Sequence, residues 1–415
     1  MPILKTTPDP DQFSVHAQDV LRGVRESLAN LLATVDASPS EPQELARRFK
    51  LHKSLTWKIG KVICEHDPWM AAVHLPGPVG LNTFVTALQR AGAPAEAAAS
   101  VHRAAQEFQR LIDVHSDDRE TLEVMAGSVS RGVAEATAES TRKLGFQANA
   151  AAWGVRALAQ ISAHFVAPNA QSPEHLDLGV ICGFVHFQRL RHNATWPVAT
   201  RRSMHDDGSP MGEHIEPLDP TIGPNDAPIM RQFCSDPVPA MRPVHSTNGT
   251  TRFEFTEGPI GKTAASTCML GWIARSLFPR HAEPGDQFGE HIVHLTTPVE
   301  VVYHDLFVHR SLNFAISPAP AAMVYSLLPG GPVYPFDGHN RGLMPLPEKA
   351  IDLGATTVAV SMPESPRYNR MIEFGAQRLG HPIGDFHAFR FRIAYPTIPS
   401  MALYRYRLPE RTASG

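Results

Sequence analysis

Histidine and carboxylate side chains gather in one stretch of the C-terminal half, EHIVHLTTPVEVVYHDLFVH, and transition metals bind such side chains. Glu290, His291 and His294 are the nearest approach to a ligand set there, because ligands two or three residues apart on adjacent strands can converge. The alternation of a strand, however, places His304 and Asp305 on opposite faces, so the histidines and acids of this stretch cannot all meet. We therefore expect hydrogen-bonded strand histidines, no bound metal and no cofactor.

A second candidate is Gly261-Lys262-Thr263, which follows an expected strand in the order typical of a phosphate-binding loop. A Walker motif needs a glycine five residues before Gly261, where this chain has Thr256. We therefore favour a structural turn, with an anion site at a helix N-terminus as the remaining alternative. The chain has no GxSxG elbow, no GxGxxG fingerprint and no CxxC pair, so no catalytic residue is assigned. An enzyme with a histidine-lined C-terminal site stays an alternative.

The strongest local charge pattern lies at residues 40–63, SEPQELARRFKLHKSLTWKIGKVI, where six lysines and arginines accompany two acids. Ser40 and Gln43 have the spacing of a capping box, and Pro42 suits a first helical turn. The apolar positions that follow predict two short helices separated by a break at KLH.

The segment ELARRFKLHKSLTWKIGKVI resembles the pattern LA-x-x-x-G-L-x-x-S-x-x-x-x-x-L of bacterial transcription regulators with an isocitrate-lyase-regulator-like winged helix. Ala46 matches the small residue of the first helix, Leu51 the apolar residue after the turn, and Ser54 the start of the recognition helix. Lys50 replaces the usual turn glycine, and Thr56 stands where valine or isoleucine is common. The resemblance covers residues 40–80 and implies a helix-turn-helix.

This resemblance implies sequence-specific contacts with double-stranded DNA. The second helix would present its polar side chains to bases and phosphates, while the arginines of the first helix would reach the backbone. The expected DNA-binding residues are Arg47, Arg48, Lys53, Ser54, Thr56, Trp57, Lys58 and Lys61. Two other interpretations stay open, namely an exterior helix with a solvated basic face and a protein-interaction module.

The segment that follows, DPWMAAVHLPGPVGL at residues 67–81, stands where a winged helix has its hairpin. Short apolar pieces around PGP are compatible with two strands. Pro76 and Pro78 would equally suit an irregular connection. We expect a helix-turn-helix domain over residues 10–80, with a wing as one of these two alternatives.

The expected secondary structure changes along the chain from helices to strands, and it must position the candidate residues described above. Apolar residues recur at helical spacing through residues 10–165, and β-branched and aromatic residues dominate afterwards. The pattern predicts an α+β protein with a helix-turn-helix domain at 10–80, a helical region at 81–168 and a mixed α/β domain at 169–410. A stretch at 203–245, rich in Pro, Asp, Gly and His, is expected to be a long loop without core residues. The expected later strands are 250–258, 291–309, 321–328, 356–362, 386–396 and 400–408, with helices at 263–278 and 365–380.

Composition limits the possible function classes. The 415 residues are 43% hydrophobic and carry a formal net charge of −3, so a polyanion site must be local. Four cysteines lie far apart, and no apolar run has the length of a signal peptide or a membrane span. We expect a cytoplasmic protein that does not enter a membrane.

Alanine-rich segments at 94–112 and 146–165 offer material for close helix packing, around Phe108, Leu111, Trp153 and Leu158. They would serve either a homodimer interface or only the core of the helical region. Regulators commonly join a DNA reader to a sensor. The sequence therefore predicts a homodimeric DNA-binding transcriptional regulator whose C-terminal domain binds a small-molecule effector or mediates assembly.

Overall fold

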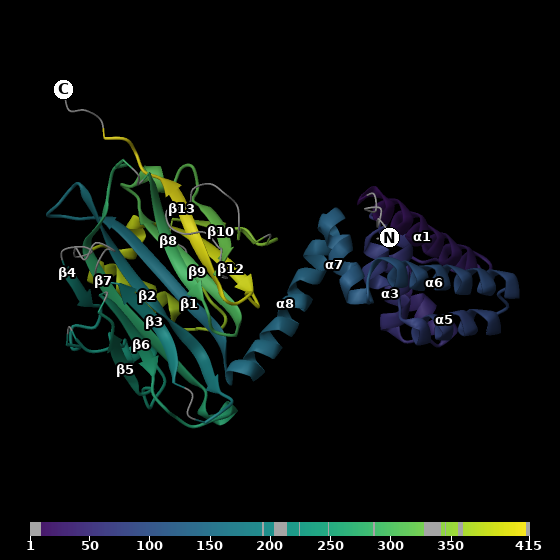
Figure 1. The fold of residues 1–415 in the computed structure, drawn as a ribbon, viewed down its shortest axis with the longest axis horizontal. Helices are drawn as coiled ribbons and strands as arrows, with labels where there is room; N and C mark the ends of the chain where they lie inside the picture. The colour runs from purple at the N-terminus through teal and green to yellow at the C-terminus, as the bar shows by residue number, and fades with distance from the viewer. Residues whose placement is uncertain are drawn as a thin grey trace, which may run out of the picture. The chain divides into compact units, whose positions relative to one another are not determined.

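A computed structural model gives the fold and describes residues 10–192, 195–202, 214–223, 225–247, 249–284, 287–327, 342–344, 346–355 and 360–411. The chain is α+β, with helices in its first third and mainly strands afterwards (Figure 1). It divides into two compact units, Met1–Ser140 and Thr141–Gly415. Of the helices described, none has the length and apolarity that a bilayer span requires.

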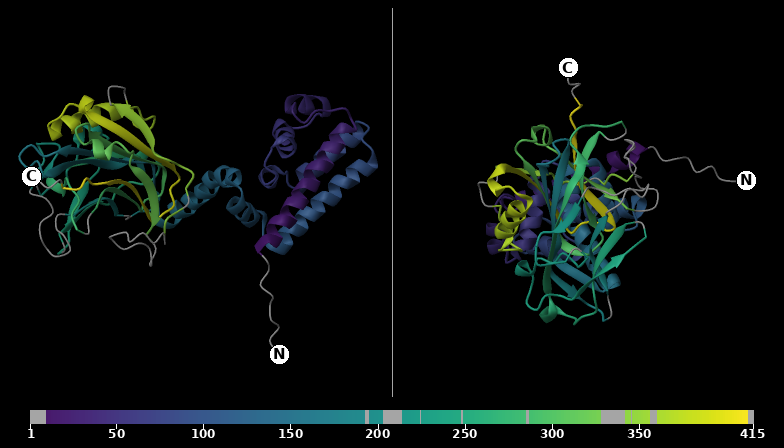
Figure 2. Two further views of the ribbon diagram at one scale, coloured as in Figure 1. Left: turned by 90° about the horizontal axis from the view of Figure 1, so that it is seen from above. Right: turned by 90° about the vertical axis from the view of Figure 1, so that its left-hand side faces the viewer.

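The first unit is helical, and its long helices α1 and α6 pack side by side (Figure 2). One apolar core runs through it from Ala17 to Val133, so the expected helix-turn-helix segment 10–80 shares its core with the helices that follow. Residues 141–168 of the expected helical region belong to the second unit. The helices are α1 (Pro10–Ala33), α2 (Pro42–Phe49), α3 (Lys53–Cys64), α4 (Met70–His74), α5 (Pro78–Arg90), α6 (Ala95–His115), α7 (Arg119–Val129) and α8 (Arg131–Trp153), the last of which continues past Ser140.

Helices α2 and α3 form the expected pair with a tight turn. Lys50 ends α2 in the left-handed conformation, with φ 52° and ψ 44°, at the position where glycine is common because it has no Cβ. The His52 ring then accepts the backbone N–H of Ser54 and caps α3. The capping box at Ser40 does not form, because Glu41 is the N-cap of α2 and makes no side-chain cap bond.

Of the two alternatives for residues 67–81, the hairpin is wrong, and the connection is helical rather than irregular. Residues 67–81 contain α4 and the start of α5 instead of two strands. Pro78 stands in the first turn of α5, where proline is tolerated because the N–H it lacks would be unpaired anyway. The helix pair therefore sits in an all-helical setting, without the wing that the family resemblance implies.

The described residues of the second unit form three sheets. The largest has the order β11-β12-β9-β1-β2-β7-β4, in which β1 and β9 are parallel and the other neighbours antiparallel. The two smaller sheets have the orders β10-β13-β8 and β3-β6-β5. The strands are β1 (Val155–Pro168), β2 (His175–Arg189), β3 (Trp196–Arg202), β4 (His214–Pro217), β5 (Met241–His245), β6 (Thr250–Phe255), β7 (Ser266–Pro279), β8 (Phe288–Leu295), β9 (Val299–His309), β10 (Ala321–Ser326), β11 (Ile351–Ala355), β12 (Phe386–Ala394) and β13 (Ser400–Arg407).

The large sheet is covered on both faces. Helix α9 (Tyr368–Leu379) lies along one face, where its apolar residues join alternate residues of β1 and β2 in one core (Figure 2). Gly375 allows this approach, since a Cβ there would lie 2.8 Å from Ile181 Cδ1. The opposite face shares a second core with residues of β6, β8 and β13. Short 3-10 turns complete the unit: η1 (Arg231–Phe233), η2 (Lys262–Ala264), η3 (Asn313–Ala315) and η4 (Ile383–Asp385).

Several expected elements differ from the structure. The helices expected at 146–165 and 263–278 are wrong in large part, because β1 begins at Val155 and β7 at Ser266. The turn at Gly261 leads into only three residues of η2, so no helix N-terminus is available there for an anion. Residues 214–245 are not a coreless loop, since β4 and β5 lie in them and Met230 is fully buried. Residues 203–213 and 356–359 lie outside the described residues.

Candidate functional site

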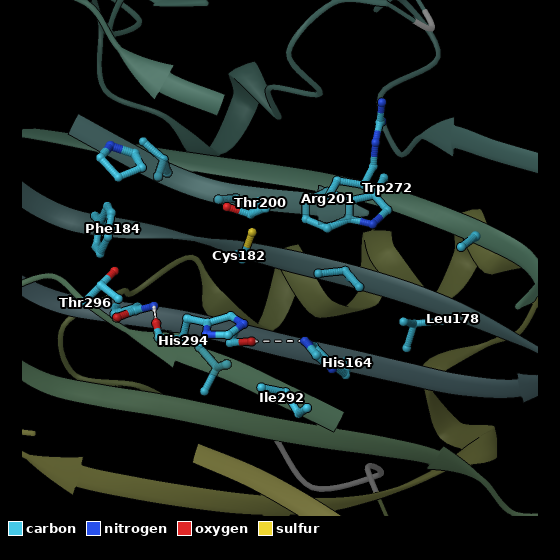
Figure 3. A pocket seen from close by; sticks show the side chains of 18 of the residues that line it. His164, Leu178, Cys182, Phe184, Thr200, Arg201, Trp272, Ile292, His294 and Thr296 are labelled. Carbon is cyan, nitrogen blue, oxygen red and sulfur yellow. Dashed lines mark hydrogen bonds between the residues drawn. The ribbon is translucent and has the colours of Figure 1, made fainter. Parts of the chain in front are cut away.

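A cavity of about 250 Å³ lies in the second unit, among β1, β2 and β7 of the large sheet and β3 and β8 of the smaller sheets (Figure 3). Because strand side chains alternate between faces, the even-numbered residues at 160–164 of β1 and 178–184 of β2 line it, while Ile161, Ala163 and Ile181 belong to the core shared with α9. Its lining on these two strands comprises Gln160, Ser162, His164, Leu178, Val180, Cys182 and Phe184. The remaining walls include Thr200, Arg201, Ile215, Trp272, Ile292, His294 and Thr297.

The walls are mainly apolar, with one positive charge. Arg201 is the cation among the described lining residues, and none of those residues is a carboxylate. Its guanidinium lies over the Phe253 ring at 5.4 Å, and burial lowers its pKa. A pocket with apolar walls, a few polar groups and one cation suits a small amphipathic molecule that carries a negative or hydrogen-bonding group.

Two buried side chains on the cavity wall have an unpaired polar atom. Gln160 donates from Nε2 to the backbone oxygen of His294 at 3.0 Å, but its Oε1 has no partner although the residue is only 8% exposed. His164 is 7% exposed, and its Nε2 lies 3.1 Å from Ser162 Oγ while its Nδ1 has no partner. Both atoms have almost no accessible surface of their own, although their residues line the cavity. A buried polar atom without a partner costs about 1–3 kcal/mol, so a side-chain rotation that lets either atom bond to a molecule in the cavity would favour binding.

Three histidine rings cluster at this wall. The His164 ring centroid lies 5.1 Å from that of His304 and 5.7 Å from that of His291. His304 Nε2 donates to the backbone oxygen of His291 at 3.0 Å, and His291 Nε2 lies 3.1 Å from the Tyr406 hydroxyl. Burial lowers the pKa of all three, that of His291 to about 3 and that of His164 well below its usual value. The rings are therefore neutral at pH 7.

The weak metal candidates do not come together. Glu290 forms an ion pair with Arg405, whereas the neighbouring His291 is buried in the cluster described above. His294 is exposed at the cavity, where surrounding protein atoms still lower its pKa by desolvation. His291 and His304 are hydrogen-bonded strand histidines, as the sequence predicts.

On the other face of β9, Asp305 belongs to a buried ion pair. Arg390 donates to its carboxylate from Nε at 2.9 Å and from Nη2 at 2.7 Å, and the Tyr368 hydroxyl donates to it at 2.5 Å. This bidentate pair joins β9, β12 and α9 and is enclosed by them, so its role is structural. The alternation therefore separates His304 from Asp305, as predicted.

Ser162 Oγ lies 3.1 Å from His164 Nε2, which is the distance expected between a catalytic nucleophile and its general base. A hydrolytic centre also needs a group that orients the imidazole, and His164 Nδ1 lacks one. The arrangement therefore supports recognition of a bound molecule better than covalent catalysis. The signal for this site was present in the sequence, because Gln160, Ser162 and His164 alternate with apolar residues at strand spacing.

The second candidate surface is the outer side of α3. Lys53, Ser54, Trp57 and Lys58 are exposed along it, and Trp57 shows 47% of its surface. The Trp57 ring packs edge-on against His74 at 5.4 Å. A flat aromatic side chain flanked by lysines suits contact with a polyanion or with a protein partner.

Other expected DNA contacts are engaged elsewhere. Thr56 is fully buried and donates its hydroxyl to the Pro42 carbonyl at 2.7 Å, so its place in a DNA surface is wrong. Arg48 donates to the backbone oxygens of residues 35 and 36, just after α1, which gives it a structural role. Arg47 is exposed but pairs with Glu44, and Lys61 pairs with a glutamate one turn later.

Comparison with known proteins adds little to this geometry. Neither the protein-family models nor the curated proteins match this chain. Among solved structures, the crystal structure of a candidate protease from Parabacteroides distasonis aligns over 61% of this chain and 40% of that chain, with 8% sequence identity and a TM-score of 0.26. A similarity of this size carries no argument about fold or activity.

Proposed function

We propose that the protein is a DNA-binding regulator whose C-terminal unit binds a small, largely apolar molecule. The observation that carries the proposal is that two residues lining an apolar cavity, Gln160 and His164, each keep a buried polar atom without a hydrogen-bond partner, Oε1 and Nδ1 respectively. Folding leaves both atoms without hydrogen bonds, and a ligand that supplies them is favoured over bulk solvent for that reason. The exposed lysines and Trp57 on α3 support the DNA-binding part.

The ligand class follows from the wall. Aliphatic and aromatic side chains favour a hydrocarbon body, and the Arg201 guanidinium favours an anionic head group, since the described lining holds no carboxylate to neutralise it. A medium-chain carboxylate combines both features. Octanoate is therefore a suitable probe, and 1-octanol is the matched probe without the charge.

Ligand binding can be measured by tryptophan fluorescence, because Trp272 lines the cavity. We expect octanoate to change the fluorescence, with the change abolished in Trp272→Phe. His164→Phe should weaken binding about tenfold, equivalent to about 1.4 kcal/mol, whereas His175→Phe, outside the cavity lining, should not. Equal binding by both histidine variants would refute this site, and tighter binding of 1-octanol would refute the anionic head group.

DNA binding can be measured by titration at several salt concentrations. Replacing Lys53 and Lys58 by Ala should weaken binding and reduce the salt slope by about one unit for each phosphate that is no longer neutralised. The control replaces two exposed lysines of the second unit, Lys262 and Lys349, and makes the same change in net charge. An unchanged slope in the α3 variant, or an equally weakened control, would contradict DNA binding through α3.

A second candidate for the α3 surface is docking of a protein partner, which the exposure of Trp57 favours. The same titrations separate the two. DNA binding through phosphates depends steeply on salt and on the lysines, whereas docking on the ring would depend on Trp57→Ala and only weakly on salt.

A further inference from the structure

Two imidazoles and one carboxylate meet at the end of β9, away from the cavity lining. His309 is the last residue of β9, His381 follows α9, and Asp385 is the last residue of η4. One ligand atom from each of the three lies within 4.8 Å of the other two. All three residues are half-buried, so the group is held by the fold and still reachable from solvent.

Backbone hydrogen bonds hold the segment after α9, which carries His381 and Asp385, against the end of β9. Gly380 ends α9 with φ 102°, which turns the chain back toward the sheet. The N–H of His381 bonds to the Ala376 carbonyl at 3.1 Å, and the N–H of Arg310 bonds to the Asp385 carbonyl at 2.9 Å. The second bond ties η4 directly to the end of β9.

The two imidazoles are also placed by their neighbours. Their ring centroids lie 4.6 Å apart, and the edge-on packing of both rings with Phe386 orients them. His309 Nδ1 lies 2.8 Å from Ser311 Oγ and 3.3 Å from the Ser311 backbone nitrogen. Nδ1 accepts that N–H when Nε2 carries the proton. With the proton on Nδ1 it donates to Oγ instead, and Nε2 is free to bind a cation.

We propose that His309, His381 and Asp385 bind a divalent transition-metal ion, with Zn²⁺ as the expected ion. Two neutral imidazoles and a carboxylate form a three-ligand set of the kind that leaves a coordination position for water. Tetrahedral zinc, with ligand bonds of about 2.0–2.2 Å, needs ligand atoms about 3.3 Å apart, so side-chain movements of about 1.5 Å close the site.

The chain contains a matched control for this site. His387 Nε2 lies 2.7 Å from Asp352 Oδ1 on the neighbouring strands β12 and β11, so it is another histidine paired with a carboxylate. It is not part of the three-residue group. His387→Ala therefore removes an imidazole next to an acid without touching the proposed ligands.

The experiment is calorimetric titration of the full chain, without a histidine tag, with ZnCl₂. We expect one equivalent to bind, and binding to weaken at least about tenfold in His381→Ala and in the conservative Asp385→Asn, but not in His387→Ala. Zinc should also raise the unfolding temperature of the parent protein and of His387→Ala only. Circular dichroism of each variant separates removal of the site from failure to fold.

Cobalt gives an independent readout, because Co²⁺ in a tetrahedral protein site absorbs visible light more strongly than hexaaqua Co²⁺. A visible band that needs both His381 and Asp385 supports the site. Equal zinc affinity in all variants, or the absence of saturable binding in a folded parent protein, would overturn the proposal.

Discussion

His291 is a buried residue of β8, and its ring lies against that of Tyr406 on β13. Burial, followed by the nearby His304, lowers its pKa from 6.5 to about 3. The unfolded chain therefore takes up a proton on this residue below pH 6.5, while the folded chain does not. The stability associated with neutral His291 is complete above pH 6.5 and is lost as the pH falls from there toward 3.

We predict that the free energy of unfolding falls more steeply with decreasing pH in the parent protein than in His291→Asn. The difference between pH 7 and pH 5 amounts to about 2 kcal/mol, because the unfolded histidine is almost fully protonated at pH 5. Urea denaturation at the two pH values measures it. A parallel pH dependence in both proteins would show that folded His291 takes up a proton over the same pH range as the unfolded chain, so that its pKa is not lowered by folding.

At the residue scale, the sequence shows the chemical type of each side chain but not the contacts that the side chain makes in the fold. The basic residues of 40–63 were identifiable, yet the helical pattern did not show that Arg48 would reach backbone carbonyls beyond α1. It also did not show that the Thr56 hydroxyl would find the Pro42 carbonyl, which permits a threonine in a fully buried position. Such contacts depend on neighbouring loops whose conformation the local pattern does not encode.

At the element scale, local signals predicted the helix pair well. α2 and α3 are short amphipathic helices whose apolar residues, Leu45, Phe49 and Ile59, enter the core of their own unit. Two segments that were expected to be helices are strands, β1 and β7, because they pair with strands that are distant in the sequence. β1 contains several alanines, which favour a helix, but it is hydrogen-bonded between β2 and β9 and buried on both faces. β7 is likewise fixed by pairing with β2.

Gly60 in α3 provides a test of how closely the pair is packed. A Cβ at this position would lie 2.7 Å from the backbone oxygen of Pro39, an atom that cannot rotate away. Gly23 in α1 has nothing within 4 Å of the same position. Both glycines are helical, so replacement by Ala gains about 0.5–1 kcal/mol from helix propensity, and only Gly60 also acquires a clash.

We predict opposite signs for the two substitutions. Gly23→Ala should stabilise the protein by about 0.5–1 kcal/mol, and Gly60→Ala should destabilise it by about 1–3 kcal/mol. Denaturant titration of the two variants beside the parent protein measures both changes. Stabilisation by Gly60→Ala would mean that the segment before α2 is not seated on α3.

At the scale of the whole molecule, charge is distributed unevenly. The chain has a formal net charge of −3, so long-range attraction to DNA is weak overall. Binding would have to rest on the local lysines of α3, including Lys53 and Lys58. A small positive surface of this kind makes few phosphate contacts, which limits the affinity that one copy of the chain can reach.

Not all of the residues that were proposed for a homodimer interface lie on the surface. Phe108 and Leu111, proposed for a helix–helix interface, are buried in the core of the helical unit. Leu158 lies on β1, while Trp153 at the end of α8 is 57% exposed. Phe108 and Leu111 are therefore core residues, whereas pairing of two copies through exposed residues of these segments, such as Trp153, stays a prediction.

Dimer formation stays a prediction because it follows from the proposed DNA binding. One helix pair buries too little surface for tight specific recognition, so two copies are expected to place their α3 helices about one DNA turn, roughly 34–36 Å, apart. Light scattering at micromolar concentration should then give twice the chain mass of 45.4 kDa. DNA with two half-sites one turn apart should bind more tightly than DNA with the same half-sites shifted by half a turn, which changes spacing but not composition. A monomer that binds both DNA molecules equally would rule out paired recognition and leave α3 only nonspecific phosphate contacts.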